Sequence, residues 1–226
     1  GPPFDLTIID DSDDDLTVEY LHRFTEQNDN VQLIRPEEKL TCANQIWNIG
    51  IRHTNHEFVA LMCNSTRVEP QWCDAALEIM KRRPDCGIIG FKLINPDRMT
   101  IQHAGVMGLK HNGMMAVAGL DEPSHRHTYV CQVPAIGMSL CLVRRSAIPP
   151  EGWKENGYIG FRGFDDLDIC LEMRQRKWDV IYCGYGSAIH IDSPTKKEKN
   201  PNFWDEYEKN KEYFIAKWKD VIKWLD

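Results

Sequence analysis

The chain has 226 residues, of which 42% are apolar and 27% are charged, so it can bury a sizeable hydrophobic core. Its 34 acidic and 27 basic residues give a formal net charge of −7, which argues against a protein that coats duplex nucleic acid. We expect no nucleic-acid partner and no membrane span, because no segment approaches the roughly 20 consecutive apolar residues that a transmembrane helix needs.

Eight cysteines are spread over the chain without any Cys-x-x-Cys pair. Most lie in apolar segments such as Ser139–Val143, which favours buried free thiols over a disulfide framework or a thiolate zinc site. Free thiols, together with a sequence that opens without a secretory signal, predict a cytoplasmic location. Gly1 and Pro2 resemble the remnant of a cleaved tag, so we do not take Gly1 as the native terminus.

Strands and helices alternate through the first 95 residues. Short apolar segments predict strands over 5–9, 31–34, 58–62 and 86–93. Apolar residues at helical spacing predict helices over 16–24, 42–52 and 70–81. Phe58–Met62 is apolar at every position, which predicts a strand buried on both faces. The alternation indicates parallel βα units, and hence an α/β fold with a mostly parallel central sheet flanked by helices.

The second half of the chain has a different pattern. Residues 96–130 show no clear periodicity and predict loops and short antiparallel strands. The pattern then predicts a strand over 133–143, a helix over 167–176 and a strand from Val180 to His190. An apolar stripe predicts a long terminal helix, and its members are Phe203, Tyr207, Phe214, Trp218, Val221 and Leu225. We expect a single α/β domain with a smaller mixed region in its second half.

Polar residues follow several of the predicted strands, and open α/β sheets bind ligands beyond the carboxyl ends of their strands. Asp10 and Asp11 follow the first strand, and Cys63-Asn64-Ser65 follows the third. His190 ends the last strand, and the acidic segment 165–168 opens the helix before it. These positions are the candidates for a ligand site.

Several motifs are informative through their order along the chain. They are Thr7-Ile8-Ile9-Asp10-Asp11-Ser12, Asn48-Ile49-Gly50-Ile51, the segment 58–72, Ile101-Gln102-His103-Ala104-Gly105, Gly163–Arg174, Trp178-Asp179-Val180, His190 and Tyr213-Phe214-x-x-Lys217-Trp218. In this order they resemble family 2 glycosyltransferases of the A-type nucleotide-sugar-binding fold, over residues 5–220. The resemblance implies one domain over 1–226, with a nucleotide-sugar-binding half over 4–95, an acceptor-binding and catalytic half over 96–200, and a C-terminal helix over 201–226.

The resemblance implies that Asp11 accepts a hydrogen bond from the imide of a uracil or thymine base. The alternative for Asp11 is an N-cap of the following helix, although Asp13 or Asp14 can serve as that cap. Other positions of these motifs are expected on the donor side of the site, and they are Asp10, Asn48, Asn64 and Ser65.

Asp166 matches the second acid of the family's Glu/Asp-Asp pair, which implies that it is the general base for the acceptor hydroxyl. Adjacent carboxylates repel each other, so the pKa of one is raised toward neutrality, which suits such a base. Asp165 is the second candidate for this role, and we expect Asp168 to orient its neighbours. The alternative is that these three acids only stabilise the N-terminus of a helix.

The segment before this acidic cluster predicts an acceptor side formed by Trp153, Phe161 and Arg162, although aromatic rings more often pack in a core. His190 matches the position of a metal-binding or diphosphate-binding histidine in the family, and a structural role is the alternative. We interpret His103 as a packed loop histidine.

Two departures from the family pattern bear on the cofactor and on the fold. The family's Asp-x-Asp position reads Cys63-Asn64-Ser65, whereas a divalent cation such as Mn²⁺ or Mg²⁺ prefers oxygen ligands that include a carboxylate. Three outcomes stay open: a metal held weakly through Ser65, phosphates and His190, protein donors in place of a metal, or an inactive donor site. Members also usually begin with a strand and a helix before the strand that matches residues 5–9. This unit does not occur in the sequence, so either it belongs to a truncated region or another segment takes its place in the sheet.

The sequence therefore predicts an inverting glycosyltransferase of the hexosyl or deoxyhexosyl type, which moves a sugar from a nucleotide-sugar donor to a hydroxyl of a glycan or similar acceptor. The alternative is a catalytically silent nucleotide-sugar or carbohydrate-binding module on the same fold. A sugar-nucleotide pyrophosphorylase shares the sheet topology, but the sequence has no glycine-rich phosphate-binding start. Further domains of a longer polypeptide are a third kind of expected partner, beside donor and acceptor.

Overall fold

The first part of the chain forms two parallel strands, two helices and the first strand of the central sheet. The computed structural model describes residues 2–109, 115–161, 163–191 and 201–222. Its first elements are β1 (Leu6–Ile9), α1 (Asp15–Glu26), β2 (Val31–Ile34), α2 (Ala43–Arg52) and β3 (Phe58–Met62). The predicted bounds of β2 and β3 are confirmed, because each is a short apolar segment between polar residues.

The remaining elements follow in a less regular order. They are β4 (Thr66–Val68), α3 (Asp74–Arg82), β5 (Cys86–Ile94), β6 (Ile101–His103), β7 (Val106–Leu109), β8 (Met115–Val117), β9 (Val130–Gln132), β10 (Leu140–Arg144), the 3₁₀ turn η1 (Arg145–Ala147), α4 (Asp165–Gln175), β11 (Asp179–His190) and α6 (Phe203–Ile222). Helix α3 begins at Asp74 rather than at Pro70, because Gln71 has a φ of 60° and cannot continue a helix. The predicted strand over 133–143 is present only from Leu140, and residues 133–139 form a connection.

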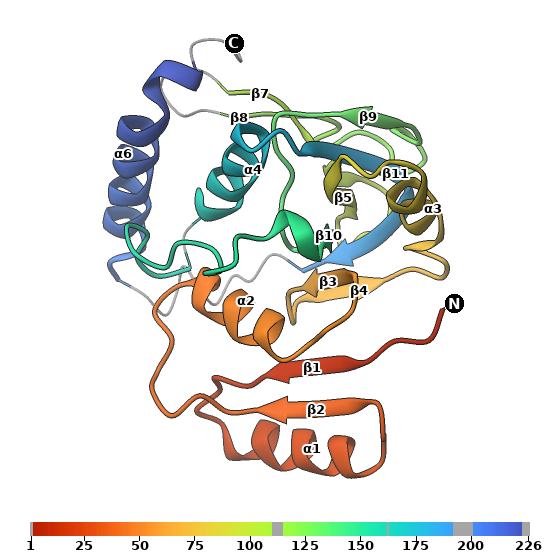
Figure 1. Cartoon of the computed structure of the whole chain (residues 1–226), viewed down its shortest axis with the longest axis vertical. Coiled ribbons are helices and arrows are strands. Elements are labelled where there is room, and N and C mark those ends of the chain that lie inside the picture. Colours follow the sequence, from red (N-terminus) through yellow and green to blue (C-terminus); the bar gives the residue numbers. More distant parts are fainter. Residues whose placement is uncertain (1, 110–114, 162, 192–200, 223–226) are drawn as a thin grey trace.

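The central sheet is mixed rather than mostly parallel. Seven strands take the order β3-β10-β5-β11-β4, with β6 beside β5 and β9 beside β11 (Figure 1). Among the described strands of this sheet, β5 and β11 form the one parallel pair, and the other pairs are antiparallel. The expected direction was wrong because β10, from the second half of the chain, inserts between β3 and β5. The α/β class, with helices on both faces of the sheet, is confirmed.

Two smaller sheets flank the central one. β1 and β2 pair in parallel by themselves, with Leu6 opposite Val31 and Ile9 opposite Ile34. Together with α1 they form one end of the molecule, and α4 and α6 lie at the other end (Figure 1). β7 and β8 form a separate antiparallel hairpin.

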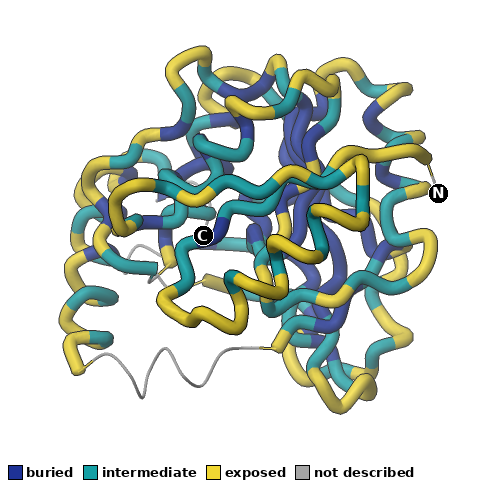
Figure 2. Tube along the Cα trace, turned by 90° about the horizontal axis from the view of Figure 1, so that it is seen from below, coloured by how far each residue is buried: buried dark blue, intermediate teal, exposed yellow. Residues whose placement is uncertain are grey.

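Two hydrophobic clusters cover the faces of the central sheet. The larger one joins the sheet to α2, α4 and α6, and includes Ile51, Leu171 and Phe214. The smaller one lies under α3 and includes Met80 and Phe91. Helix α1 contributes no buried residue, in contrast to the buried strands (Figure 2). The core is therefore formed by the central sheet and the later helices.

β3 is not buried on both faces, as its apolar sequence suggested. Val59 and Leu61 are 8% and 5% exposed, whereas Ala60 is exposed and Met62 is 45% exposed. β3 is the edge strand of the sheet, with β10 as its described neighbour. No helix in the described part of the chain combines the length and the apolar character that crossing a bilayer requires.

Candidate active site

Three strands of the central sheet end at the same edge. β10 runs antiparallel to both β3 and β5, and β11 runs parallel to β5, so β3, β5 and β11 share one direction. The turn after β3 therefore meets the end of β11. His190 lies opposite Thr66, and the Ile191 N–H donates to the Ser65 carbonyl over 2.9 Å. The structure thus brings the Cys63-Asn64-Ser65 turn and His190 together at the carboxyl edge of the sheet.

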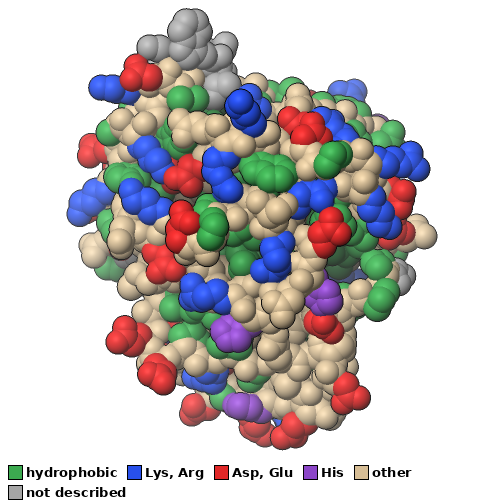
Figure 3. Space-filling model, viewed as in Figure 1, with side chains coloured by type: hydrophobic (Ala, Val, Ile, Leu, Met, Phe, Trp, Pro, Cys, Tyr) green, Lys and Arg blue, Asp and Glu red, His purple; other side chains and the backbone are tan. Residues whose placement is uncertain are grey.

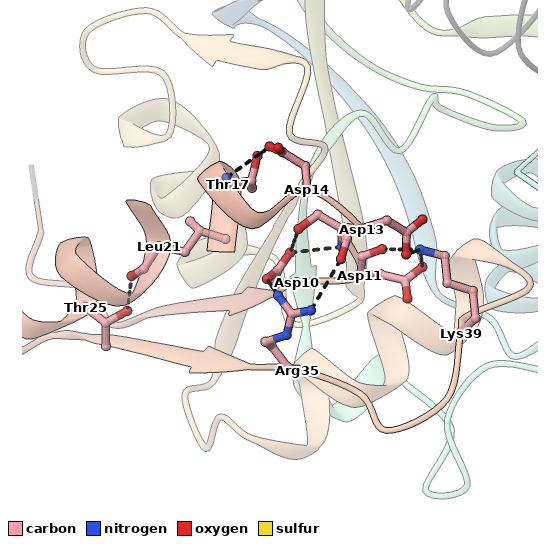
Figure 4. Close-up of polar contacts among 10 residues, drawn as sticks. Asp10, Asp11, Asp13, Asp14, Thr17, Leu21, Thr25, Arg35 and Lys39 are labelled. Atoms are coloured by element: carbon pink, nitrogen blue, oxygen red, sulfur yellow. Dashed lines mark hydrogen bonds and ion pairs between the residues drawn. The ribbon is translucent and has the colours of Figure 1, made fainter. Parts of the chain in front are cut away.

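At the end of β1, Asp10 is turned into the protein (Figure 4). Its carboxylate accepts hydrogen bonds from the Ser12 N–H over 3.0 Å, from the Ser12 hydroxyl over 2.6 Å and from Arg35 over 2.5 Å. Burial opposes ionisation, but the bonds from Ser12 and Arg35 outweigh it and lower the pKa of Asp10. These contacts hold the loop after β1, and direct donor contact by Asp10 stays a prediction.

Asp11 keeps a more accessible carboxylate than Asp10. One of its oxygens lies 3.4 Å from the Leu40 N–H, and the other lies 3.8 Å from Lys39 Nζ (Figure 4). Asp14, not Asp11, caps α1, because the Asp14 carboxylate accepts the Thr17 N–H over 3.0 Å. The cap that competed with a ligand role for Asp11 is therefore provided by another residue.

Helix α4 begins from a strained turn. Gly163 and Phe164 have positive φ angles of 80° and 71°, and a phenylalanine rarely adopts this conformation. The Phe164 ring is 2% exposed and packs against Tyr207 and Phe214 of α6, with ring centroids 5.2 and 5.4 Å away. Packing against α6 holds this turn, which places an acidic pair in the first turn of α4.

Asp166, the second acid of this pair, has a strongly perturbed pKa. Burial and the negative charge of the adjacent Asp165 raise the pKa of Asp166 to about 7. Its Oδ1 atom accepts the Leu167 N–H over 2.8 Å, which lowers the pKa without outweighing burial. The Asp166 side chain is still partly exposed, so it can exchange a proton with a ligand near neutral pH.

Asp168 has a different environment from its two neighbours. It is 1% exposed and accepts hydrogen bonds from Trp218 Nε1 over 2.5 Å and from Lys217 Nζ over 2.8 Å. Lys217 also donates to Glu172, further along α4, over 2.6 Å. Asp168 therefore ties α6 to the helix that carries Asp166.

The segment before α2 links the end of β1 to the start of α4. Leu40 donates to Asp11, and Cys42 forms a β-bridge with Gly160, in the loop that leads to α4. The Cys42 thiol also interacts electrostatically with Asp165. The carboxyl end of β1 and the start of α4 are thus joined through the same short segment.

Asp166 and the turn after β3 both lie near Cys141 of β10. The buried Cys141 of β10 interacts electrostatically with both Cys63 and Asp166, and burial raises the pKa of this thiol. Cys141 therefore connects the Cys63-Asn64-Ser65 turn to the acidic pair of α4. Asn64 is exposed in this turn, and Ser65 is partly buried.

Asn48 was predicted on the donor side of the site and Trp153 on the acceptor side. In the structure two buried hydrogen bonds join the Asn48 side chain to the Trp153 backbone. Asn48 Nδ2 donates to the Trp153 carbonyl over 2.7 Å, and Asn48 Oδ1 accepts the Trp153 N–H over 2.8 Å. Asn48 is 2% exposed and Trp153 is 3% exposed, with its ring in the main core. Trp153 therefore packs in the core, which is the alternative that the sequence left open for its ring. The two residues position the loop that precedes α4.

Phe161 and Arg162 follow this loop. Phe161 is partly exposed, and its contact with an acceptor stays a prediction. Arg162, the other residue predicted on the acceptor side, lies outside the described residues.

The described residues do not offer a divalent cation the ligands it prefers. The Cys63-Asn64-Ser65 turn holds no carboxylate, and in the described ranges no group of three or more His, Cys, Asp and Glu side chains is arranged to hold a metal ion. His190, predicted as a metal ligand, has its Nδ1 atom 2.6 Å from the Gln102 amide oxygen, which orients the ring. We therefore find no fit between these residues and Mn²⁺ or Mg²⁺.

Two residues of the Gln-His-Ala-Gly motif belong to this region, although neither was predicted to have a role in the site. Gln102 orients His190 through the contact just described, and His103 lies near His190. Burial and the neighbouring His190 lower the pKa of His103 to about 4, so His103 is neutral and accepts the Gly105 N–H over 3.0 Å. The motif marked these two residues in the sequence. It did not indicate that Gln102 contacts His190, because His190 lies 88 residues further along the chain.

An α/β domain with an acid after its first strand, and an acidic pair on a helix beside the carboxyl edge of a mixed sheet, has the arrangement of nucleotide-sugar-dependent transferases. Residues 2–212 match the family described as Glycosyltransferase like family 2. The chain belongs to this family.

Solved structures with the same fold include two glycosyltransferases. GalNAc-T7, solved with UDP, GalNAc and Mn²⁺, is 15% identical with a TM-score of 0.67, and the match covers 94% of this chain and 44% of that chain. The mannosyltransferase PcManGT from Pyrobaculum calidifontis, solved with GDP-Man and Mn²⁺, is 11% identical with a TM-score of 0.58, and the match covers 93% and 60%. At these identities the likeness is one of fold.

One relative is also similar in sequence over nearly the whole chain. The protein y4gI of Sinorhizobium fredii (strain NBRC 101917 / NGR234) is 23% identical over 228 residues, which is 96% of this chain and 24% of that protein. The chain thus spans about a quarter of the length of this relative.

Proposed function

We propose that the chain is the catalytic domain of an inverting glycosyltransferase, which transfers a sugar from a nucleoside-diphosphate donor to a hydroxyl of a glycan or similar acceptor. In this step the Asp166 carboxylate takes the proton of the acceptor hydroxyl while that oxygen attacks the anomeric carbon. The new carbon–oxygen bond forms as the bond to the diphosphate breaks, and the diphosphate leaves with the bonding electrons. Attack from the face opposite the leaving group inverts the anomeric configuration.

The single observation that carries this proposal is the environment of Asp166. A carboxyl with a pKa of about 7 is ionised in part at neutral pH, and is a much stronger base than an ordinary aspartate. The residue is partly exposed, and it follows a strained turn held by α6. Strain of this kind concentrates at functional sites, where it fixes a reacting group in position.

We propose that the donor lies between the end of β1 and the turn after β3. The Asp11 carboxylate can accept an N–H of the base, which fits a uracil or thymine imide. Asn64 and Ser65, in the turn after β3, would face the sugar and diphosphate. Asp10 and Asn48 would support this side by holding the loops that they already bond.

The negative charge of the leaving diphosphate needs a partner. Mn²⁺ accompanies the nucleotide in the GalNAc-T7 and PcManGT structures. The described residues of this chain hold no carboxylate at the turn after β3, so we route no step through a metal. We propose that His190, oriented by Gln102, contacts the diphosphate instead.

Replacement of Asp166 tests the mechanism. Asp166→Asn keeps the size of the side chain but cannot accept a proton, so we expect transfer to fall at least about 100-fold. Calorimetry should find an unchanged dissociation constant for the donor. The assay pairs UDP-, dTDP- and GDP-sugars with glycan acceptors, with and without Mn²⁺, and the anomeric configuration of the product is read by NMR. Asp205→Asn, an exposed acid of α6, is the matched control and should keep full activity.

Full activity of Asp166→Asn would remove Asp166 as the base. A product with retained configuration would exclude the inverting mechanism, even if Asp166 proved essential.

The second candidate function is a silent nucleotide-sugar or carbohydrate-binding module, and the carboxylate-free Cys63-Asn64-Ser65 turn favours it. In that case a nucleotide-sugar raises the melting temperature of the wild-type chain through ligand linkage, but neither transfer nor donor hydrolysis appears. The wild-type assay therefore separates the two candidates before any variant is made.

The setting of the domain is also a proposal. We propose a cytoplasmic location, because all eight cysteines are free thiols, which is typical of a reducing compartment. We further propose that the domain acts within a longer polypeptide, as in y4gI, and that its donor and acceptor halves meet near residue 95.

A further inference from the structure

Two buried asparagines of α2 hold the segment 153–155, in the loop that leads to α4. Asn44 and Asn48 are each 2% exposed and are four residues apart, so they lie on one face of the helix. Asn44 Nδ2 donates to the Lys154 carbonyl over 2.7 Å, and Asn48 forms the two hydrogen bonds with the Trp153 backbone. Buried amide groups are costly unless they are bonded, so these contacts fix the position of the segment on α2.

The close approach of α2 to this segment requires a glycine. Gly152, directly before Trp153, has a φ of 86°, and a Cβ atom added there would lie 2.6 Å from Asn48 Oδ1. Another residue would meet both a disfavoured conformation and a lack of space. The backbone of the segment is therefore held precisely, although it belongs to a loop.

The side chains of the three residues in this segment have different surroundings. Trp153 packs in the main core, and Lys154 Nζ donates to the Tyr213 hydroxyl of α6 over 2.9 Å. Glu155 is partly exposed, and its Oε1 atom accepts the Asn48 Nδ2 group over 2.8 Å. Each oxygen of a carboxylate can accept two hydrogen bonds, so Glu155 can also accept donors from a ligand.

Glu155 and the acidic pair of α4 share a neighbour. The Cys42 thiol donates to the Glu155 carbonyl over 3.4 Å, and it interacts electrostatically with the carboxylates of Glu155 and Asp165. Cys42 is 3% exposed, so it lies beneath this group of acids rather than in solvent. Glu155 therefore adds a third carboxylate beside Asp165 and Asp166, and it comes from the loop that was predicted to form the acceptor side.

A general base needs the acceptor hydroxyl within hydrogen-bond reach, at about 2.6–3.2 Å. A sugar carries several hydroxyl groups of similar reactivity, and contact with Asp166 does not by itself select one of them. A second contact with the sugar fixes its orientation and presents a single hydroxyl to the base. A carboxylate on a rigid segment is suited to this contact, because it can accept two neighbouring hydroxyl groups at once.

We infer that Glu155 binds the acceptor sugar, and that its carboxylate accepts hydrogen bonds from hydroxyl groups next to the one that faces Asp166. The inference rests on the transferase function proposed above and names the class of its acceptor, which is a neutral sugar or glycan with neighbouring hydroxyl groups. An acceptor with its own carboxylate is disfavoured, because like charges repel each other beside these three acids. Glu155 orients the acceptor and takes no proton from it.

Glu155→Gln separates this role from a structural one. The glutamine keeps an oxygen for Asn48 but replaces the other oxygen with an NH₂ donor, so we expect the melting temperature to stay unchanged. The KM for the acceptor should rise at least about 10-fold, and kcat should stay within about threefold of wild type. Glu151→Gln, an exposed acid of the same loop, is the matched control and should leave KM unchanged.

Deoxygenated acceptors identify the hydroxyl groups that Glu155 binds. The methyl glycosides of glucose, galactose and mannose are compared with derivatives that lack one hydroxyl group. Loss of a bound hydroxyl should raise the KM of the wild type but have no further effect in Glu155→Gln, because both changes remove the same hydrogen bond. Methyl glucuronide differs from methyl glucoside by one carboxylate, and should be at least about 10-fold the poorer acceptor of the wild type.

Direct binding of the same glycosides, measured by saturation-transfer NMR, separates this inference from the transferase function. Weaker binding to Glu155→Gln, without transfer by any variant, would support Glu155 as a sugar ligand and remove the proposed transfer.

Three results would overturn the inference. The first is transfer by Glu155→Gln with an unchanged KM, and the second is a wild-type preference for the glucuronide, and both leave the transferase in place. The third is a wild-type chain that binds none of the glycosides. A lowered melting temperature of Glu155→Gln with an unchanged KM would belong to the first case, because Glu155 would then only hold the loop.

Discussion

Aspartates cluster both at the end of β1 and at the start of α4, but the pKa of Asp10 is lowered in the first region and the pKa of Asp166 is raised in the second. At the end of β1 the carboxylates have cationic or N–H partners: Arg35 bonds Asp10, and Lys39 bonds Asp13 over 2.9 Å. At the start of α4, Asp166 accepts hydrogen bonds from backbone N–H groups, those of Leu167 and of Asp166 itself, and it has the negative charge of Asp165 beside it. The same residue type therefore holds a fixed negative charge in one region and a proton-exchanging group in the other.

The difference shows that the number of acids in a region says little about its chemistry. Acidic side chains gather around the β1–β2–α1 end on the face seen in Figure 3, where solvent and nearby cations stabilise them. The pKa of Asp10 is lowered there, whereas the pKa of Asp166 is raised to about 7. Partners and burial, rather than composition, separate a charged surface from a candidate base.

Asp168 offers the largest test of this comparison, because it is an acid of α4 whose carboxylate is fully bonded. Asp168→Ala leaves Lys217 and the Trp218 N–H without their buried partner, so we expect a loss of about 3 kcal/mol in the free energy of unfolding. In a chain of this size that lowers the melting temperature by about 10 °C, as calorimetry would record.

Glu208→Ala is the matched control for Asp168→Ala. Glu208 bonds Lys211 over 2.8 Å on the exposed side of α6, so its loss should cost less than about 0.5 kcal/mol. Equal losses for the two variants would show that Asp168 does not hold α6 to α4.

Asp165→Asn should change the pH dependence of transfer rather than its maximum. A base must be deprotonated, so the wild-type rate should rise with pH through about 7, the pKa of Asp166. Removal of the Asp165 charge lowers the pKa of Asp166, so the rising limb moves to lower pH by about one unit. The measurement is kcat/KM against pH for both proteins, and an unmoved limb would contradict the proposed role of Asp166.

Much of the fold was predictable from local patterns in the sequence. β2 and β3 have the predicted bounds because their signals are short apolar segments. The direction of the sheet was not predictable in this way, since it depends on β10, which is far along the chain from the strands it separates. The exposure of Ala60 and Met62 was not predicted, because a continuously apolar sequence does not distinguish an edge strand from a central strand of a sheet.

The site was predictable as a set of positions but less so as a set of roles. The order of the motifs pointed to Asp11, Asp166 and His190. The structure places His190 beside the turn after β3, and residues 40 and 42 contact Asp11 and Gly160, in the loop that leads to α4. Asn48 and Trp153 differ, because their roles depend on a contact between residues that are 105 positions apart. Sequence spacing contains no direct record of such a contact.

Asp10→Asn is the smallest of the expected effects, and it tests the other side of the comparison. Because the pKa of Asp10 is lowered in the folded chain, its ionised form stabilises the fold above the ordinary value of 3.8. That stabilisation is lost as the pH falls through the lowered pKa. We expect Asp10→Asn to lower the free energy of unfolding by about 1 kcal/mol at pH 7, and the difference from wild type to shrink in acid.

Denaturant unfolding at pH 7 and near pH 3 measures both values. Asp13→Asn is the matched control, because the Asp13 side chain is 88% exposed. A difference in unfolding free energy that does not change with pH would mean that the shape of Asp10, rather than its charge, stabilises the fold. Asp10 would then no longer serve as the ionised counterpart of Asp166.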